Sequence, residues 1–410
     1  MSSSFGRKAW PLALAGLGAI AVAQDASAHN GMLPYCHGAI DCGMGGAGVA
    51  QAHDATSTAL NPALAGKLGN EVSINAGWFN TERTMDAKGN LANTTNGKQT
   101  SQLENYPDGS LAANFRINDQ FAIGTVLYSG GGGETKYAKS RLGAGAGVTN
   151  GMWDRQVRIR KANWATGLSY TPSKDSAYGA SVILGYQDFK TDFAAASNNN
   201  GVNNGKMELD RAWGYGMRFG GAWNIDQNWG IGGFVQTPIW FQRFDKYKDV
   251  FIGPIDEPAQ VGFGLVVHAT PEIDLLGDFK AIMWDQVRAI GTEPAQGGFG
   301  WQMQPVIALG AEWHASQSWT LRAGWNYGES PIDANHVFAN AMFPAINEHH
   351  ITGGATYVIN ERWEISGSAY WSPEKRLGEQ GTGDAYSTGG ARTEITHEQF
   401  GALAGLRWKF

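Results

Sequence analysis

The chain has 410 residues, of which 57 are glycine and 16 are tryptophan, and only 17% are charged. Beyond the first 28 residues there is no run of 18 apolar residues, which excludes a helical membrane protein. The formal net charge of −6 does not suggest a nucleic-acid-binding protein. Many glycines and aromatics with moderate polarity are typical of a membrane β-barrel, although the length also allows two soluble domains.

The first 28 residues have the features of a secretory signal peptide. Arg7 and Lys8 precede an apolar stretch, residues 11–23, and Ala26-Ser27-Ala28 supplies a small-residue cleavage site. The apolar stretch is too short to cross a membrane as a helix. We therefore predict cleavage after Ala28 and a location outside the cytoplasm.

Cys36 and Cys42 follow closely and are the only two cysteines of the chain. In an oxidising compartment such a pair predicts a small disulfide ring. Two free thiols are the alternative. A metal site is less favoured, because His37 and Asp41 would have to supply ligands from the same tight loop.

A glycine cluster comes next in the sequence. Gly43, Gly45 and Gly48 match the pattern G-x-G-x-x-G of dinucleotide-binding loops. That function requires a preceding strand, which is missing here, and export from the cytoplasm also counts against it. We interpret these glycines as sites where the chain bends tightly in a crowded interior.

From residue 71 onward, apolar and small or polar residues alternate with period two. In residues 211–223, Trp213, Tyr215 and Phe219 share one parity, whereas Gly214 and Arg218 share the other. A strand places these two sets on opposite faces. Bulky aromatics opposite glycine and arginine suit a barrel wall with lipid outside and a tight polar lumen. The same pattern recurs in residues 261–268, 319–327, 363–371 and 399–410.

Such segments number about fourteen, an even number that suits a closed antiparallel barrel. We predict strands near residues 71–79, 110–117, 120–129, 156–171, 177–188, 206–225, 229–242, 259–269, 272–287, 302–314, 319–328, 349–359, 362–372 and 396–410. Short and long connections alternate between them, as in outer-membrane barrels with short periplasmic turns and long external loops. The predicted fold class is therefore all-β, a transmembrane antiparallel β-barrel, rather than a soluble sandwich or propeller.

The sequence resembles the FadL/TodX (OMPP1) family of outer-membrane transporters for long-chain fatty acids and other hydrophobic compounds. The resemblance rests on residues 43–63 (GMGGAGVAQAHDATSTALNPA), residues 117–137, residues 321–333 and the final LRWKF. It implies a hatch, or plug, formed inside the lumen by residues 29–69, and a barrel formed by residues 70–410. It also implies a kinked third strand that leaves a lateral opening in the wall.

The resemblance assigns roles to two groups of residues. The hatch would be built on Gly43, Gly45, Gly46, Gly48, Asp54, Asn61, Pro62 and Ala63. The lateral opening would lie at Ser129, Gly130, Gly131, Gly132 and Gly133, because glycines release the backbone from ladder geometry. The alternative is that these glycines merely begin an external loop.

Two further groups are candidates for substrate contact. Aromatic residues in the external loops could capture apolar compounds or could pack against other loops: Trp240, Phe241, Phe244, Phe251, Phe338 and Phe343. Arg218, Lys280 and Arg322 face the lumen and could hold a carboxylate head group. They could equally pair with Asp274, Asp278 or Asp54, since buried charges need partners.

We therefore expect passive transport of hydrophobic small molecules, either fatty acids or hydrocarbons, by capture, luminal binding, hatch movement and lateral exit. A general porin and an adhesin are the alternatives. The expected location is the Gram-negative outer membrane, as a monomer among lipid and lipopolysaccharide. Phe410 resembles the terminal aromatic signal that the barrel assembly machinery reads.

No enzyme motif links the nine histidines to the carboxylates of the chain. The nearest approach to a metal motif is Glu348-His349-His350, which lies at a junction between loop and strand and is interpreted as solvated. We therefore predict neither a catalytic site nor a metal site, and no cofactor is indicated.

Overall fold

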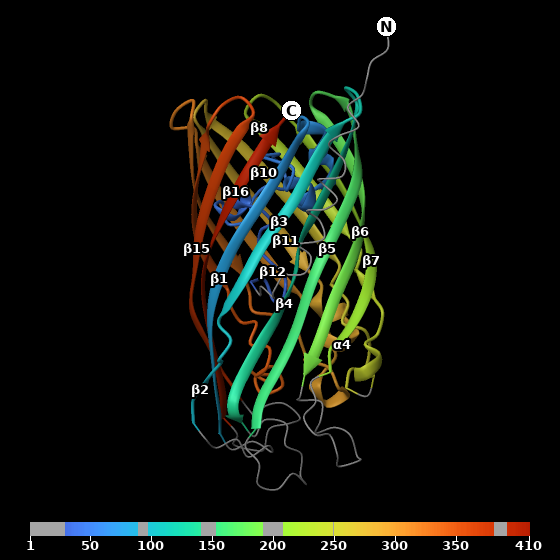
Figure 1. Cartoon of the computed structure of the whole chain (residues 1–410), viewed down its shortest axis with the longest axis vertical. Coiled ribbons are helices and arrows are strands. Elements are labelled where there is room, and N and C mark those ends of the chain that lie inside the picture. The colour runs from blue at the N-terminus through green and yellow to red at the C-terminus, as the bar shows by residue number, and fades with distance from the viewer. Residues whose placement is uncertain (1–28, 89–96, 141–152, 192–207, 249, 381–391) are drawn as a thin grey trace.

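The computed structural model describes residues 29–88, 97–140, 153–191, 208–248, 250–380 and 392–410. The signal peptide predicted for residues 1–28 lies outside these residues. Within them, one antiparallel sheet of 16 strands includes two strands of only two residues, β2 (Gln99–Thr100) and β9 (Trp240–Phe241). The others follow one another in chain order, and β16 pairs with β1, which closes a barrel of fourteen long strands (Figure 1). The predicted fold class is confirmed.

The long strands are β1 (Glu71–Lys88), β3 (Asn105–Arg116), β4 (Phe121–Ser140), β5 (Trp153–Ser173), β6 (Ser176–Thr191), β7 (Asp210–Asn224), β8 (Trp229–Gln236), β10 (Gln260–Thr270), β11 (Ile273–Ile282), β12 (Gln304–Trp313), β13 (Trp319–Gly328), β14 (His349–Val358), β15 (Trp363–Gly378) and β16 (Arg392–Lys409). The short helices are α2 (Ala39–Cys42), α3 (Ser57–Leu60), η1 (Pro62–Lys67), η3 (Asp245–Tyr247), η4 (Trp284–Gln286), α4 (Arg288–Gly291) and η5 (Pro294–Gln296). None of the described helices has the length and hydrophobicity needed to cross a membrane.

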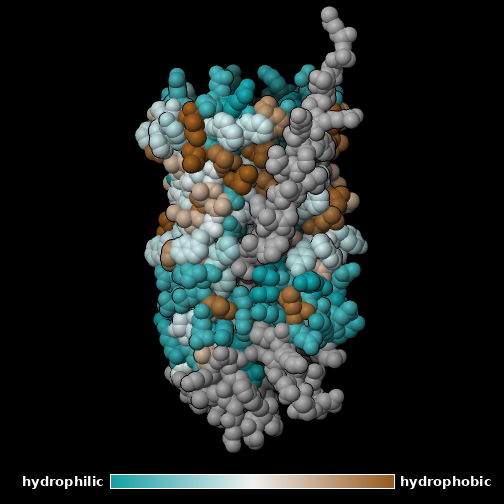
Figure 2. Space-filling model, viewed as in Figure 1, coloured by the Kyte–Doolittle hydropathy of each residue, from teal (hydrophilic) through white to brown (hydrophobic). Residues whose placement is uncertain are grey.

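The two faces of the wall differ as the alternation predicts. On β7, Trp213 and Tyr215 are 61% and 63% exposed on the outer face, whereas Gly214 and Gly216 lie on the inner face. Hydrophobic residues gather on the outside in a band below a hydrophilic rim, with a hydrophilic surface on the other side of the band (Figure 2). This band has the distribution expected of a lipid-facing belt.

The two ends of the barrel also differ. Tight connections such as residues 225–228 and 359–362 lie at one end, here called the short-turn end, where the last strand also finishes (Figure 1). The opposite, long-loop end carries α4, η3 and longer described connections such as residues 329–348. This alternation agrees with the predicted connections.

Some strand bounds differ from the prediction. The segment predicted at 229–242 is interrupted after Gln236, because Pro238 lacks the N–H that a ladder needs, and the chain resumes as β9. β1 and β4 extend well past the predicted ends at residues 79 and 129. Segments that read as external loops are therefore partly strand.

Candidate functional site

Residues 29–69, here called the hatch, lie inside the barrel toward the short-turn end (Figure 1, blue ribbon). Cys36 and Cys42 form a disulfide bond, and the ring that it closes contains the whole of α2, whose last residue is Cys42. The α2 helix packs against β14, β15 and β16, whereas η1 packs against β5, β6 and β7. The hatch is thus attached to two different sides of the wall.

The glycine loop of the hatch is a close-packed contact with the wall rather than a phosphate site. Gly45 and Gly46 have positive φ angles of 67° and 78°, a conformation that residues with a Cβ rarely adopt. The Gly45 N–H donates to Thr352 Oγ1 at 2.9 Å, and its carbonyl accepts from Asn326 Nδ2 at 3.0 Å. Further along, Asp278 Oδ2 accepts the backbone N–H of Gly48 at 2.8 Å. Wall side chains therefore satisfy the backbone of this loop.

Asn61 links the hatch to itself and to the wall. Its Nδ2 donates to the carbonyls of Val49 and Gly221, each at 2.9 Å, and its Oδ1 accepts the N–H of Ala63 at 3.0 Å. Pro62 then occupies the first position of η1, where a missing N–H costs nothing. The predicted motif Asn61-Pro62-Ala63 therefore connects the hatch to the wall through hydrogen bonds. Asp54, also assigned to the hatch, accepts the N–H of Thr56 at 2.9 Å.

Asp41 gives the hatch a pH-dependent element. Its two carboxylate oxygens accept the backbone N–H groups of His37 at 2.8 Å and Gly38 at 2.7 Å. Burial raises the pKa of Asp41 from 3.8 to about 7. This pKa is higher in the folded hatch than in an unfolded chain. The hatch therefore loses stability as the pH rises from about 4 to about 7.

We therefore expect hydrogen exchange of the amides of residues 36–48, corrected for intrinsic rates, to become faster as the pH rises from about 4 to about 7. The Asp41→Asn variant, which has no carboxyl to ionise, is expected to show a flat profile. Slower corrected exchange at the higher pH would contradict the assignment of this pH dependence to Asp41.

The wall is incomplete between β3 and β4. Their pairing ends at Ser110 and Tyr128. β3 nevertheless continues to pair with β1 as far as Asn105, and β4 with β5 as far as Ser140. Residues 103–109 and 129–135 therefore face each other without a ladder, and we call this region the ladder gap.

The glycines of β4 explain why the pairing stops. The register against β5 shifts between Ser129 and Gly131, and Gly131 has a φ of 87°. The Gly132 N–H donates to the carbonyl of Met32 in the hatch at 2.9 Å. This part of β4 is therefore bound to the hatch instead of to β3. The interpretation of Gly130–Gly133 as the start of an external loop is wrong, because β4 continues to Ser140.

Side chains bridge the ladder gap. The Tyr106 hydroxyl donates to the carbonyl of Glu134 at 3.0 Å, which joins the two sides. Arg83 Nη2 donates to the same hydroxyl at 2.7 Å. Beyond these contacts, the Gln102 N–H donates to the carbonyl of Lys136 at 2.8 Å. Sequence patterning did not single out Met32, Arg83 or Tyr106, because nothing local marks a residue whose partner lies on another strand.

The aromatic candidates of the loops divide into two groups. Phe244, Phe251 and Phe338 are buried in one apolar cluster at the long-loop end, with Phe343 packed against it. Phe241 belongs to the same cluster, and Lys161 Nζ lies 5.3 Å from its ring centroid. Trp240, in contrast, is 44% exposed and lies 5.7 Å, centroid to centroid, from the outward-facing Tyr215. The structure does not bring Trp240 together with the others.

The three luminal cations have different surroundings. Arg322 Nε donates to Glu312 Oε2 at 2.5 Å, so it pairs with none of the predicted partners. Arg218 donates to Gln236 Oε1 at 2.9 Å and to the hatch carbonyl of Leu60 at 3.2 Å. Among the described residues, neither Arg218 nor Lys280 has a carboxylate oxygen within the 4.0 Å of an ion pair.

Arg218 and Lys280 line one luminal pocket. The lining combines apolar hatch residues, wall polar groups and the edge of the ladder gap: Leu33, Pro34, Leu60, Tyr128, Ser129, Gly130, Phe234, Glu257 and Ile282 are among its members. Its volume is about 30 Å³, room for a few water molecules at most. The pocket adjoins the ladder gap directly, because Ser129 and Gly130 belong to both.

The possible metal motif Glu348-His349-His350 does not form a cluster. Glu348 Oε2 pairs with Lys375 Nζ at 2.6 Å. His349 stacks on the outer face, 5.8 Å from the Trp325 ring, whereas His350 is buried inside, 4.9 Å from the Tyr35 ring. Adjacent residues of a strand point to opposite faces, which separates the two imidazoles.

A closed barrel with an apolar outer belt and a filled lumen is typical of an outer-membrane β-barrel protein. The comparisons with known proteins agree. The family model described as outer membrane protein transport protein (OMPP1/FadL/TodX) matches residues 255–408. This part of the chain is therefore similar to the proteins that this model describes.

Individual relatives support the same relationship. A long-chain fatty acid transport protein of Escherichia coli O6:H1 is 23% identical over 386 residues, which cover 82% of this chain and 84% of the relative. The structure of the Pseudomonas putida toluene transporter TodX matches with a TM-score of 0.69 and 17% identity, covering 92% of this chain and 99% of that one. A Pseudomonas aeruginosa FadL homologue matches with a TM-score of 0.66 and 13% identity, covering 95% and 100%. These two structures share the fold.

Proposed function

We infer that the protein carries hydrophobic small molecules passively across the outer membrane. In this proposal the apolar cluster at the long-loop end receives the compound, the luminal pocket binds it, and the ladder gap releases it sideways into the bilayer. The observation that carries the proposal is the shared boundary of the pocket and the gap at Ser129 and Gly130. The hatch has to shift, because the pocket is too narrow for such a compound in the arrangement described above.

Transport by this route needs no external source of free energy. Each buried CH₂ group favours binding by about 0.8 kcal/mol, so an apolar compound is held in the lumen only until a better apolar environment is reachable. The bilayer beside the ladder gap is such an environment. A shift of the hatch lowers the affinity of the pocket and lets the compound leave.

A general porin is less well supported. The hatch occupies the lumen, and the luminal pocket holds a few water molecules at most. Polar solutes would therefore lack a continuous wet path. A direct test is uptake of a labelled lipophilic tracer by cells without their own carriers. Equal uptake with and without the protein would contradict the proposal.

The substrate class that the pocket favours is a hydrophobic carboxylate, such as a fatty acid. Arg218 and Lys280 line the pocket together, and the luminal wall supplies neither with a paired carboxylate within the described residues. A ligand carboxylate would supply that missing partner in a region of low dielectric, where such pairing matters most. A pure hydrocarbon would form no ion pair with either cation.

We therefore expect the Lys280→Met variant to bind a long-chain carboxylate about tenfold more weakly than the wild type, corresponding to one charge-assisted hydrogen bond. Binding of the fatty alcohol of equal chain length should change little, and this alcohol is the matched control. Isothermal titration in detergent measures both affinities. Equal losses for acid and alcohol would assign Lys280 a structural role.

A further inference from the structure

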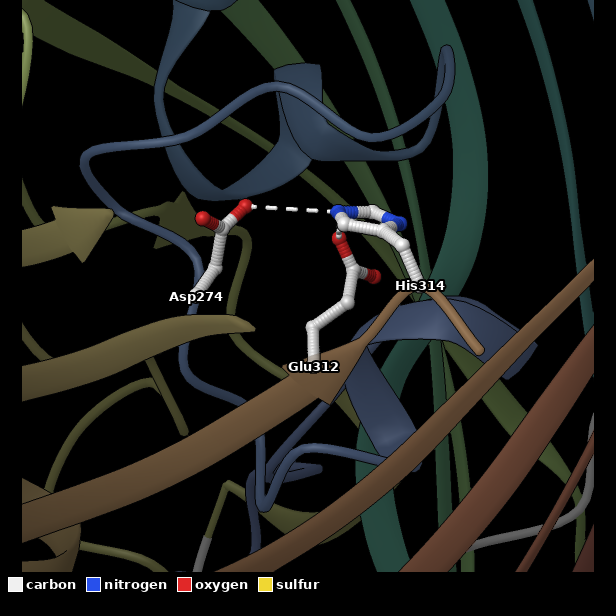
Figure 3. Close-up of side chains that lie close together, drawn as sticks. All are labelled: Asp274, Glu312 and His314. Carbon is white, nitrogen blue, oxygen red and sulfur yellow. Dashed lines mark ion pairs between the residues drawn. The ribbon is translucent and has the colours of Figure 1, made fainter. Parts of the chain in front are cut away.

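A second group of chemically reactive side chains lies at the short-turn end, away from the luminal pocket. Asp274 stands at the start of β11, Glu312 near the end of β12, and His314 just beyond it. Their side chains point toward one another next to the hatch (Figure 3). One ligand atom from each lies within 4.8 Å of the others.

The separations resemble those around a bound metal ion. His314 Nε2 is 3.6 Å from Asp274 Oδ2 and 3.6 Å from Glu312 Oε1. Ligands bound tetrahedrally to zinc at about 2.0–2.2 Å lie about 3.3–3.6 Å apart. Gln51 Nε2 donates to Asp274 Oδ2 at 3.1 Å, so this hydrogen bond would be released as side-chain rotations bring the three atoms onto one ion.

The hatch adds a fourth group. His53 Nε2 is 3.9 Å from Glu312 Oε1, and the His53 side chain is only 7% exposed. This nitrogen is buried and has no hydrogen-bond partner among the residues that the structure describes. An unpartnered buried imidazole nitrogen is costly, and a metal ion would satisfy it.

The outer oxygens of the carboxylates are already held by other donors. Arg322 Nε donates to Glu312 Oε2 at 2.5 Å, and His268 Nδ1 lies 2.6 Å from Asp274 Oδ1. Such outer contacts orient metal-binding carboxylates in known sites. His314 Nδ1 lies 3.4 Å from Thr320 Oγ1, which leaves Nε2 directed at the cluster.

The charge balance and the exposure also suit a cation. Within the described ranges, Arg322 is the one arginine or lysine paired with these two carboxylates. The cluster therefore keeps a net negative charge when the imidazoles are neutral. The side chains of His314 and His268 are 41% and 40% exposed. An ion can therefore enter from the solvent at the short-turn end.

We propose that His53, Asp274, Glu312 and His314 form a binding site for a zinc-like divalent transition metal, shared between the hatch and the wall. Two imidazole nitrogens with two carboxylate oxygens are a ligand set that Zn²⁺ accepts. The bound ion would tie residues 51–54 of the hatch to β11 and β12. It would therefore favour the docked position of the hatch.

Zinc binding is tested on the full-length protein in detergent, after dialysis against a chelator, by titration with ZnCl₂ against a chromophoric zinc chelator. We expect one Zn²⁺ per chain. The variants His53→Gln and His314→Gln should each bind at least about tenfold more weakly, since even outer contacts of metal sites contribute about 10–100-fold. His349→Gln, on the outer wall, is the matched control and should bind like the wild type.

A second measurement addresses the link to the hatch. Zn²⁺ should slow hydrogen exchange at residues 49–53 in the wild type and not in His53→Gln. The extended X-ray absorption fine structure of the zinc-loaded wild type should show two imidazole nitrogens, a readout that requires no variant to fold. Heat-modifiability on gels verifies that each variant forms the barrel.

The proposal is overturned if the wild type binds no Zn²⁺, or if His53→Gln binds zinc as tightly as the wild type does. Absorption spectra with fewer than two imidazole nitrogens would also overturn it. None of these measurements uses a transported compound. Failure of the metal site therefore leaves the transport proposal intact, and failure of transport leaves the metal site intact.

Discussion

Replacing Gly131 with alanine is expected to lower uptake of a lipophilic tracer at least about tenfold. A Cβ built at Gly131 would lie 1.8 Å from the Met32 carbonyl oxygen, and the φ of 87° is unfavourable for any L-residue. A left-handed backbone alone costs about 1–2 kcal/mol for a residue with a Cβ, and about 1.4 kcal/mol shifts a population tenfold. β4 should therefore leave the hatch, resume ordinary pairing and close the ladder gap.

Gly133 supplies the matched control two residues away. A Cβ at Gly133 would meet only Phe343, at 3.5 Å, which is an ordinary contact. Gly133→Ala should therefore transport like the wild type. Both variants should retain heat-modifiability, since the remaining wall pairs normally. Undiminished uptake by Gly131→Ala would exclude the ladder gap as the exit.

The wall could be predicted from the sequence because its physics is local. In a strand with lipid on one side and a crowded lumen on the other, apolar and small or polar residues must alternate. Trp213 and Gly214 can therefore be assigned to the outer and inner face from the local sequence alone. The tight connections at the short-turn end could also be predicted from their local sequence. Predicted strand ends were wrong where a strand passes beyond the lipid, because β1 and β4 are no longer constrained to alternate there.

The candidate site was predictable only in part, because its decisive contacts join segments far apart in the chain. Gly130–Gly133 could be read as a kink or as a loop, and the choice depends on the carbonyl of Met32, about 100 residues earlier in the sequence. The metal cluster combines His53 with Asp274, Glu312 and His314. No spacing rule connects these residues, because only barrel closure around the hatch brings them together.

Deleting residues 29–60 is expected to convert the closed barrel into a conducting pore. The hatch fills the lumen, and glycines such as Gly310 and Gly324 are pressed against it: a Cβ at either would lie 2.8 Å or less from Met44. Without the hatch these positions would face open space surrounded by polar wall groups. Barrels of sixteen to eighteen strands hold a water-filled channel, and a barrel of fourteen strands without its plug should also admit ions.

Single-channel conductance in planar bilayers measures this change. We expect steady ion conductance for the deletion variant and almost none for the wild type. The Asp278→Ala variant, which removes the acceptor for the N–H groups of Gly48 and Val49, should show brief openings between long closed periods. Conductance should therefore increase from the wild type to Asp278→Ala to the deletion variant, if a few hydrogen bonds hold the hatch in place. A heat-modifiable deletion variant that conducts no better than the wild type would mean that wall side chains, rather than the hatch, close the lumen.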